Sequence, residues 1–197
     1  MPTNSERKDS TVAGLVLAAG FSRRFGSDKR CARLSNGQTL LAASLELPCA
    51  FLEQVWVVLR PEDDCGALGV LAPVQVVRNP DAELGMGHSL ASGMERVSQV
   101  TKASAIAVFL GDMPWIAADS LKHLMTLASP EHIVVPTYRE RPGHPVLFGR
   151  RFWPALQGLS GDTGAKSLIS ANSQAVRYLT LDDPGILRDI DVPQLLE

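Results

Sequence analysis

Residues 13–29 read AGLVLAAGFSRRFGSDK, an apolar run followed by a loop of small and basic residues. The apolar run, Ala13–Ala18, is too short for a helix and long enough for a buried strand. Gly20 and Gly26 can adopt backbone conformations that other residues avoid, and small residues let the backbone approach a ligand closely. The stretch therefore predicts a buried strand that ends in a ligand-binding loop.

Three further apolar runs of the same kind follow along the chain. They span Gln54–Arg60, Val74–Arg78 and Ala105–Leu110. Near-continuous apolar strands are typical of a parallel sheet that is covered on both faces. Apolar residues at helical spacing predict covering helices over Thr39–Leu47, Gly87–Gln99 and Asp119–Leu127. This alternation predicts an α/β fold, a Rossmann-like, doubly wound sheet with right-handed crossovers.

The last third of the chain mixes strand and helix patterns. Strands are predicted over His132–Pro136, Pro145–Phe148 and Ala175–Leu181, and a helix over Thr163–Ala171. We interpret this region as an insertion or C-terminal half that completes the substrate pocket, and we expect a mixed, mostly parallel sheet. Residues 12–197 are predicted to form a single domain, and residues 1–11 a mobile N-terminal tail.

The composition is ordinary for a globular protein. Hydrophobic residues make up 45% of the 197 residues, charged residues 20%, and the formal net charge is -2. Nucleic-acid-binding proteins usually carry a basic surplus, so no such partner is expected. No segment resembles a signal peptide or a membrane span, which predicts a cytoplasmic protein. Because Cys31, Cys49 and Cys65 are odd in number and not closely paired, we expect reduced thiols.

The loop after the first strand combines features that suit a triphosphate. Its small residues can turn several backbone N–H groups toward phosphate oxygens, and Arg23, Arg24 and Lys29 add positive charge. It lacks the Gly-Lys-Ser/Thr ending of a P-loop, and Gly14 precedes the strand, which does not fit a dinucleotide fingerprint. The alternative is an ordinary strand-to-helix loop with a solvated basic face.

Acidic residues stand at two places where a metal could bind. Asp112 follows the run 105–110, and the strand order 3-2-1-4 would place it beside the first loop, in the ligand crevice of such sheets. A carboxylate beside phosphates requires a cation, and oxygen ligands favour Mg²⁺ over zinc. Asp189 and Asp191, two residues apart, point the same way on an extended chain. Alternatively, Asp191 caps a helix that begins after it.

Five other residues admit both a structural and a binding role. Asn79, Gly85 and Ser89 offer an amide, close backbone approach and a hydroxyl to a nucleotide, but they also fit a turn followed by an ordinary helix start. His144 lies in a loop rich in proline and glycine, which favours a pocket. Asp162 could equally be a helix N-cap.

The motifs together resemble a known family. Residues 17–29 are similar to the signature loop of the molybdenum cofactor nucleotidyltransferases, with Phe25 where the family usually has methionine. Gly111–Pro114 (GDMP) resembles the family's Gly-Asp-x-Pro motif, and Asp189–Pro193 (DIDVP) its terminal Asp-Ile-Asp-Thr-Pro. The resemblance runs from Val12 to Leu195. It implies a fold of the nucleotide-diphospho-sugar transferase type, within the sugar-phosphate nucleotidyltransferase superfamily.

The resemblance also implies roles for individual residues. Catalytic roles are implied for Lys29, Arg23 and Asp112. The implied Mg²⁺ ligands are Asp112 and Asp191, with Asp189 as an alternative. Nucleotide contacts are implied for Leu17, Ala18, Ala19, Gly20, Ser22, Arg24, Lys29, Asn79, Gly85 and Ser89. Segments similar to the family's Gly-His-Pro and Gly-Asp-x-Gly-Ala-Arg/Lys motifs imply an acceptor site at His144, Pro145, Gly161, Asp162 and Gly164.

The triplet Ala18-Ala19-Gly20 resembles the cytidylyl-transferring branch of this family, whereas guanylyl-transferring relatives tend to carry glycine at the position of Ala19. This implies an enzyme that transfers CMP from CTP to the phosphate of molybdopterin, releases pyrophosphate, and forms molybdopterin cytosine dinucleotide for a recipient molybdoenzyme. One alternative is the same chemistry with GTP, a sugar phosphate or phospholactate. A non-catalytic factor that delivers molybdenum cofactor is another. A third alternative is a nicotinamide-dependent dehydrogenase, but the chain lacks the glycine-rich dinucleotide-binding fingerprint of such enzymes.

Overall fold

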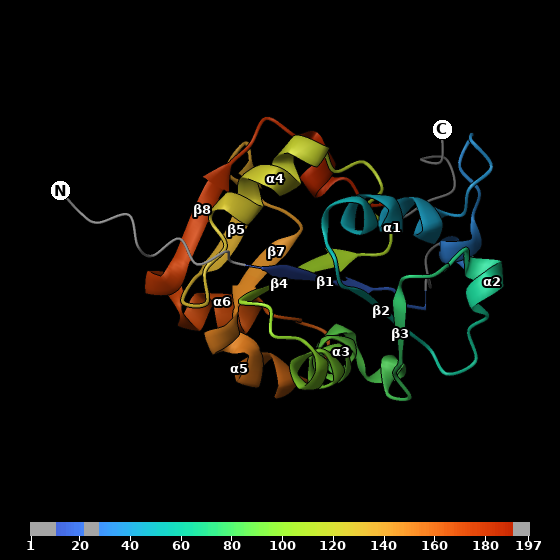
Figure 1. Cartoon of the computed structure of the whole chain (residues 1–197), viewed down its shortest axis with the longest axis horizontal. Coiled ribbons are helices and arrows are strands. Elements are labelled where there is room, and N and C mark those ends of the chain that lie inside the picture. The colour runs from blue at the N-terminus through green and yellow to red at the C-terminus, as the bar shows by residue number, and fades with distance from the viewer. Residues whose placement is uncertain (1–10, 22–27, 191–197) are drawn as a thin grey trace.

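The computed structural model describes residues 11–21 and 28–190, whose strands form a single eight-stranded sheet with helices on both faces (Figure 1). In chain order the strands are β1 Val12–Leu17, β2 Val55–Leu59, β3 Gln75–Arg78, β4 Ala105–Leu110, β5 Ile133–Tyr138, β6 Arg141–Pro142, β7 Val146–Gly149 and β8 Val176–Thr180.

The first four strands run parallel in the order β3-β2-β1-β4. This strand order was assumed from the sequence, and it places the end of β4, where Asp112 lies, beside the loop that follows β1. Each of the four lies within one or two residues of its predicted span. Their burial explains the continuous apolar pattern, since every residue of β1 and β2 is buried. The predicted Rossmann-like core is therefore confirmed.

The strands of the last third extend the same sheet. β7 is antiparallel to its neighbours β4 and β5, and β8 runs parallel to β5. The sheet is thus mixed and mostly parallel, as predicted. The sequence analysis missed β6, a two-residue strand that pairs antiparallel with β5 and contains Pro142. A proline cannot donate to a sheet ladder, so such a short segment carries no strand signal.

Helices cover the two faces of the sheet in separate groups (Figure 1). α1 and α4 lie on one face, and α3, α5 and α6 lie on the other. α2 and α5 are four and five residues long, too short for a periodic pattern, and were not predicted. The helices are α1 Leu40–Phe51, α2 Cys65–Leu68, α3 Met86–Val100, α4 Ala118–Thr126, α5 Trp153–Gln157 and α6 Lys166–Ala171.

Two helices differ from their predicted spans for identifiable reasons. α1 begins one residue later than predicted, since Thr39 is its N-cap, and continues past Leu47 to Phe51. It does so because the carbonyl of Pro48 still accepts from the Leu52 amide at 2.9 Å. α6 begins three residues later than predicted. Gly164 has a φ of +55°, a left-handed conformation that interrupts the helix.

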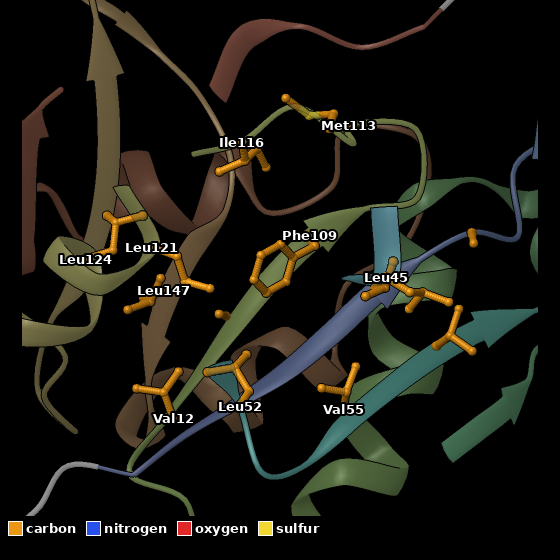
Figure 2. Packing of buried hydrophobic residues seen from close by; sticks show 14 of the residues in the cluster. Val12, Leu45, Leu52, Val55, Phe109, Met113, Ile116, Leu121, Leu124 and Leu147 are labelled. Atoms are coloured by element: carbon orange, nitrogen blue, oxygen red, sulfur yellow. The ribbon is translucent and has the colours of Figure 1, made fainter. Parts of the chain in front are cut away.

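The two groups of helices bury two hydrophobic clusters against the sheet. Successive side chains of a strand point to opposite faces, so Val16 joins the cluster beneath α1 and α4, while Leu15 joins the cluster beneath α3 and α5. Figure 2 shows the first cluster, in which Phe109 of β4 lies among side chains from α1, α4 and β7. Within the described ranges, no helix is both long and apolar enough to cross a membrane.

A buried carboxylate ties the C-terminal part of the chain to α4. Asp183 is 8% exposed and accepts hydrogen bonds from the Ala117 amide (2.9 Å), the Ser120 hydroxyl (2.7 Å) and the Gly185 amide (2.8 Å). The N-cap residue of α4 is Ala117, which has no side-chain acceptor. Asp183 therefore satisfies the first turn of α4 from a distant segment, and the chain continues from there to Ile190.

Replacing Asp183 with alanine should lower the free energy of unfolding by about 1–3 kcal/mol, because buried donors of α4 would lose their acceptor. Chemical denaturation measures this loss. Asp119→Ala is the matched control on the same helix: that carboxylate is 81% exposed and pairs with Lys122 at the surface. The control should leave the free energy of unfolding nearly unchanged, as surface substitutions usually do. Equal losses in the two variants would contradict the capping role.

Candidate functional site

A cavity of about 490 Å³ opens at the carboxyl ends of β1 and β4. This is where a parallel sheet of this order binds ligands. Four separate segments of the chain and one residue of a fifth form its wall. The lining residues are Leu17, Ala18, Ala19, Gly20 and Phe21, then Lys29 and Arg30, then Ala82, Glu83, Gly85, Met86 and Ser89, then Leu110, Gly111 and Asp112, and finally Asp162.

Lys29 and Asp112 form an ion pair in this cavity. The Lys29 Nζ lies 2.6 Å from Asp112 Oδ2 and donates a second hydrogen bond to the Ile190 carbonyl at 3.1 Å. Both side chains are less than one-fifth exposed. The Ile190 amide in turn donates to the Asp112 carbonyl at 3.1 Å. The structure thus brings together two predicted catalytic residues that are 83 positions apart, with the C-terminal segment against them.

The second carboxylate oxygen of Asp112 is buried and accepts no hydrogen bond from the described residues. An unpaired, buried anionic oxygen is costly unless a donor or a cation satisfies it. Its position in the cavity wall makes it suited to hold a cation that arrives with a ligand.

The start of α3 packs against the loop that precedes α6. The Gly87 amide donates to the Gly161 carbonyl at 2.7 Å, and the Gly161 amide donates to His88 Nδ1 at 3.1 Å. Gly85 has a φ of +112°, and a Cβ there would lie 2.3 Å from Asp162 Oδ1. A Cβ at Gly87 would also meet the backbone of this loop. Close packing therefore requires glycine at both Gly85 and Gly87. The two motifs form one wall, on which Asp162 lies beside the predicted nucleotide residues.

Ser89 lines the cavity, whereas Asn79 lies behind it. Asn79 is 1% exposed, and its side-chain amide donates to the Ser89 hydroxyl at 3.1 Å. Its carbonyl oxygen accepts from the Asp81 amide at 3.0 Å. Both functional groups of Asn79 are thus engaged inside the protein, where they orient Ser89 and shape the turn. A direct contact between Asn79 and a nucleotide stays a prediction.

The other predicted acceptor residues do not line this cavity. His144 is partly buried, its amide donates to the Ile186 carbonyl at 2.9 Å, and its Nδ1 has no partner among the described residues. Burial lowers the pKa of His144, although a hydrogen bond with the Val108 backbone and the charge of Asp112 oppose this. The adjacent Pro145 is buried. Gly161 and Gly164 shape the loop instead, both with positive φ.

Several predicted residues lie outside the part of the chain that the structure describes. They are Ser22, Arg23, Arg24 and Asp191. Their predicted roles therefore stay predictions. Asp189 is described and is exposed.

The sequence analysis missed two arginines that bind the first loop from behind. Arg30 donates to the Ala18 carbonyl at 2.6 Å, and Arg60 donates to the Ala19 carbonyl at 3.2 Å. The positions of these two arginines in the sequence could have indicated a role at the loop. Arg30 follows the predicted catalytic Lys29, and Arg60 follows the buried strand β2, whose carboxyl end borders the crevice.

This architecture matches a family of known proteins. The MobA-like NTP transferase domain family matches residues 14–176. The purine catabolism protein PucB of Bacillus subtilis (strain 168) is 35% identical over 193 residues, 93% of this chain and 93% of that protein. The molybdenum cofactor guanylyltransferase of Rhodobacter capsulatus is 27% identical over 185 residues, 88% of this chain and 87% of that protein.

The protein Rv0371c of Mycobacterium tuberculosis H37Rv is similar in structure. One crystal structure superposes with a TM-score of 0.80 at 30% identity and covers 93% of this chain and 94% of that chain. A structure of its complex with manganese superposes with a TM-score of 0.68 at 27% identity and covers 87% of this chain and 88% of that chain.

Adding one methyl group at Gly87 should destabilise the wall between α3 and the Gly161 loop. A Cβ there would lie 2.6 Å from the Ser160 carbonyl oxygen, so Gly87→Ala should cost about 1–3 kcal/mol of unfolding free energy, as overpacking does. At Gly158 the nearest atom would be 3.7 Å away. Gly158→Ala should therefore leave thermal and chemical unfolding nearly unchanged. An unaffected Gly87→Ala variant would show that the two segments separate easily.

Proposed function

The chain belongs to the family of MobA-like NTP transferases, and within it we propose that this protein transfers CMP from CTP to the phosphate of molybdopterin, with release of pyrophosphate. The observation that carries the proposal is the Lys29–Asp112 pair, which faces the β1 loop across one cavity. A cation, a carboxylate and a glycine-containing loop are the groups that position a triphosphate and stabilise its charge. The product, molybdopterin cytosine dinucleotide, would then pass to a recipient molybdoenzyme.

We propose that a divalent cation binds at Asp112, whose Oδ1 is buried and accepts no hydrogen bond from the described residues. In the described ranges, no three His, Cys, Asp or Glu side chains gather into a metal site, so Asp112 and phosphate oxygens of the nucleotide would hold a Mg²⁺ ion. Asp191 is the proposed second ligand and Asp189 the alternative. When bound, the ion would neutralise charge on the phosphate groups. The manganese complex of Rv0371c supports this proposal, since Mn²⁺ also prefers oxygen ligands.

The residues of the chain have separable tasks in the proposed reaction. Lys29 would donate to phosphate oxygens, and its present bonds to Asp112 and to the Ile190 carbonyl hold its ammonium group at the cavity wall. Ser89 offers a hydroxyl to the nucleotide. The acceptor phosphate is itself an ionised nucleophile, so the transfer needs no general base and no covalent intermediate. Arg23 is proposed to stabilise the leaving pyrophosphate.

Guanylyl transfer is the second candidate, because a relative over most of the chain is a molybdenum cofactor guanylyltransferase. The two candidates share the cavity, the metal and the reaction, and they differ in the base. Ala19 is 2% exposed and lies in the cavity wall. Its methyl group is the feature that we propose to disfavour a purine. Pyrophosphate release with molybdopterin and each triphosphate in turn decides between them.

Removing either member of the ion pair should abolish most turnover. Lys29→Ala should lower kcat by about 10²–10³, as the loss of one transition-state donor does, and Asp112→Asn should lower it at every Mg²⁺ concentration. The measurement is pyrophosphate release during a magnesium titration. Lys102→Ala, which changes an exposed lysine just before β4, should retain the parental rate. Near-parental turnover in both site variants would overturn the assignment.

Nucleotide choice should depend in part on Ala19. The parent protein should use CTP with a higher kcat/KM than GTP. Ala19→Gly should raise the relative use of GTP by roughly tenfold, since one methyl group in a pocket discriminates only modestly. A parent that prefers GTP would replace the cytidylyl proposal with the guanylyl one and leave the site otherwise unchanged.

A further inference from the structure

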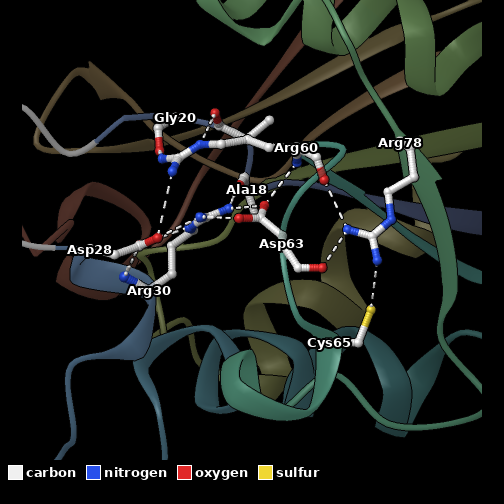
Figure 3. A network of polar contacts seen from close by, with 9 residues as sticks. Ala18, Gly20, Asp28, Arg30, Arg60, Asp63, Cys65 and Arg78 are labelled. Atoms are coloured by element: carbon white, nitrogen blue, oxygen red, sulfur yellow. Dashed lines mark hydrogen bonds and ion pairs between the residues drawn. The ribbon is translucent and has the colours of Figure 1, made fainter.

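Arg30 uses every N–H of its guanidinium inside the protein (Figure 3). It is 3% exposed and lies between the carboxylates of Asp28 and Asp63. Nη2 lies 2.5 Å from Asp28 Oδ2 and Nη1 lies 2.5 Å from Asp63 Oδ2, with further bonds to the second oxygen of each carboxylate. The fifth N–H donates to the Ala18 carbonyl at 2.6 Å. Five donors thus meet five acceptors.

Arg60 continues this row of contacts along the loop. Its Nε donates to the Ala19 carbonyl at 3.2 Å, and its Nη2 donates to the Gly20 carbonyl. The guanidinium also lies over the Phe21 ring, 4.1 Å from the ring centre, and 3.6 Å from Asp28 Oδ2. Two arginines therefore hold three successive carbonyls from one side of the loop.

This arrangement decides where the next three amides point. A trans peptide is planar, so the N–H of each residue points opposite to the preceding carbonyl. The amides of Ala19, Gly20 and Phe21 must therefore point away from the two guanidinium groups. All three residues line the cavity, and none of these amides donates to another described residue. Three such N–H groups would form an anion-binding nest if they converged on one point.

The network carries little net charge of its own. Two arginines and two aspartates sum to a formal charge of zero. Burial acts to raise the pKa of Asp28, but the contacts with Arg30 outweigh it, so the pKa lies below its ordinary value and the carboxyl stays ionised. Long-range attraction of an anion thus comes from elsewhere, and the contribution of this network is the orientation of the loop.

We propose that Arg30 and Arg60 are positioning residues, which hold the Ala18, Ala19 and Gly20 carbonyls so that the three following amides converge on the phosphate groups of the substrate. In a regular strand, successive carbonyls alternate in direction. Three carbonyl dipoles on one side repel each other unless cations face them, and the two guanidinium groups supply those cations. The inference rests on the proposed nucleotidyl transfer, and it names residues that the proposed reaction does not include.

The test uses Arg60→Met, which removes two carbonyl contacts and leaves the Arg30 bonds in place. Its matched control is Arg78→Met. Arg78 lies beside this network and also donates to two backbone carbonyls, those of Arg60 (2.8 Å) and Asp63 (2.7 Å), but it touches no carbonyl of the loop. A merely structural role predicts similar effects in both variants. A positioning role predicts that Arg60→Met alone weakens anion binding.

Isothermal titration calorimetry measures the affinity of each variant for inorganic tripolyphosphate and for CTP. Steady-state kinetics then shows whether each substitution changes KM or kcat. Arg60→Met should weaken binding of both ligands about tenfold or more, since the amides of Gly20 and Phe21 lose their orientation together, and should leave binding of cytidine unchanged. Arg60→Lys, which can reach one carbonyl, should recover part of the loss. Arg78→Met should bind both ligands as the parent does.

The inference is overturned if Arg60→Met binds tripolyphosphate like the parent, or if Arg78→Met weakens it equally. It is also overturned if cytidine binding falls as much as CTP binding. Because tripolyphosphate has no base and accepts no transfer, it probes the loop even if the parent releases no pyrophosphate from CTP. Failure of the proposed function and failure of the positioning role are therefore distinguishable.

Discussion

Strands β1 and β4 run parallel and side by side, with Leu17 opposite Leu110 in the register. Because the two strands end together, the loop that follows β1 and the Gly111-Asp112 turn that follows β4 open onto the same crevice. The ion pair between Lys29 and Asp112 depends on this pairing. The apolar faces of both strands pack against helices on either side, so the register cannot slip without exposing buried side chains.

The C-terminal part of the chain completes the site through a second set of constraints. Asp183 holds the start of α4 and the following turn, and the backbone then reaches Asp112 through reciprocal contacts at Ile190. The Lys29 ammonium group bonds to both. Lys29 from the loop after β1, Asp112 from the end of β4 and Ile190 from the C-terminal part of the described chain thus meet at one point. Charge pairing and backbone hydrogen bonds, rather than apolar packing, set that geometry.

The loop after β1 shows how a neutral network can orient successive backbone carbonyls. Buried ion pairs often contribute little to stability, because desolvation offsets attraction. Here the pairs of Arg30 with Asp28 and Asp63 orient a guanidinium whose last donor meets a backbone carbonyl. In this arrangement the ion pairs shape the loop, while the bonds of Lys29 to Asp112 and to the Ile190 carbonyl hold its ammonium group at the cavity wall.

The sequence by itself determined the parallel core and the position of Asp112 at the end of β4, because apolar runs and their ends are local signals that follow from burial. It did not indicate that Asn79 lies behind Ser89, or that Asp162 shares a wall with Gly85. Nor did it show that Arg30 and Arg60 hold the loop carbonyls. Those facts depend on contacts between distant segments, and residue type and spacing do not encode which donor meets which acceptor. Only the tertiary structure decided them, since most buried polar groups are satisfied by partners that are distant in the sequence.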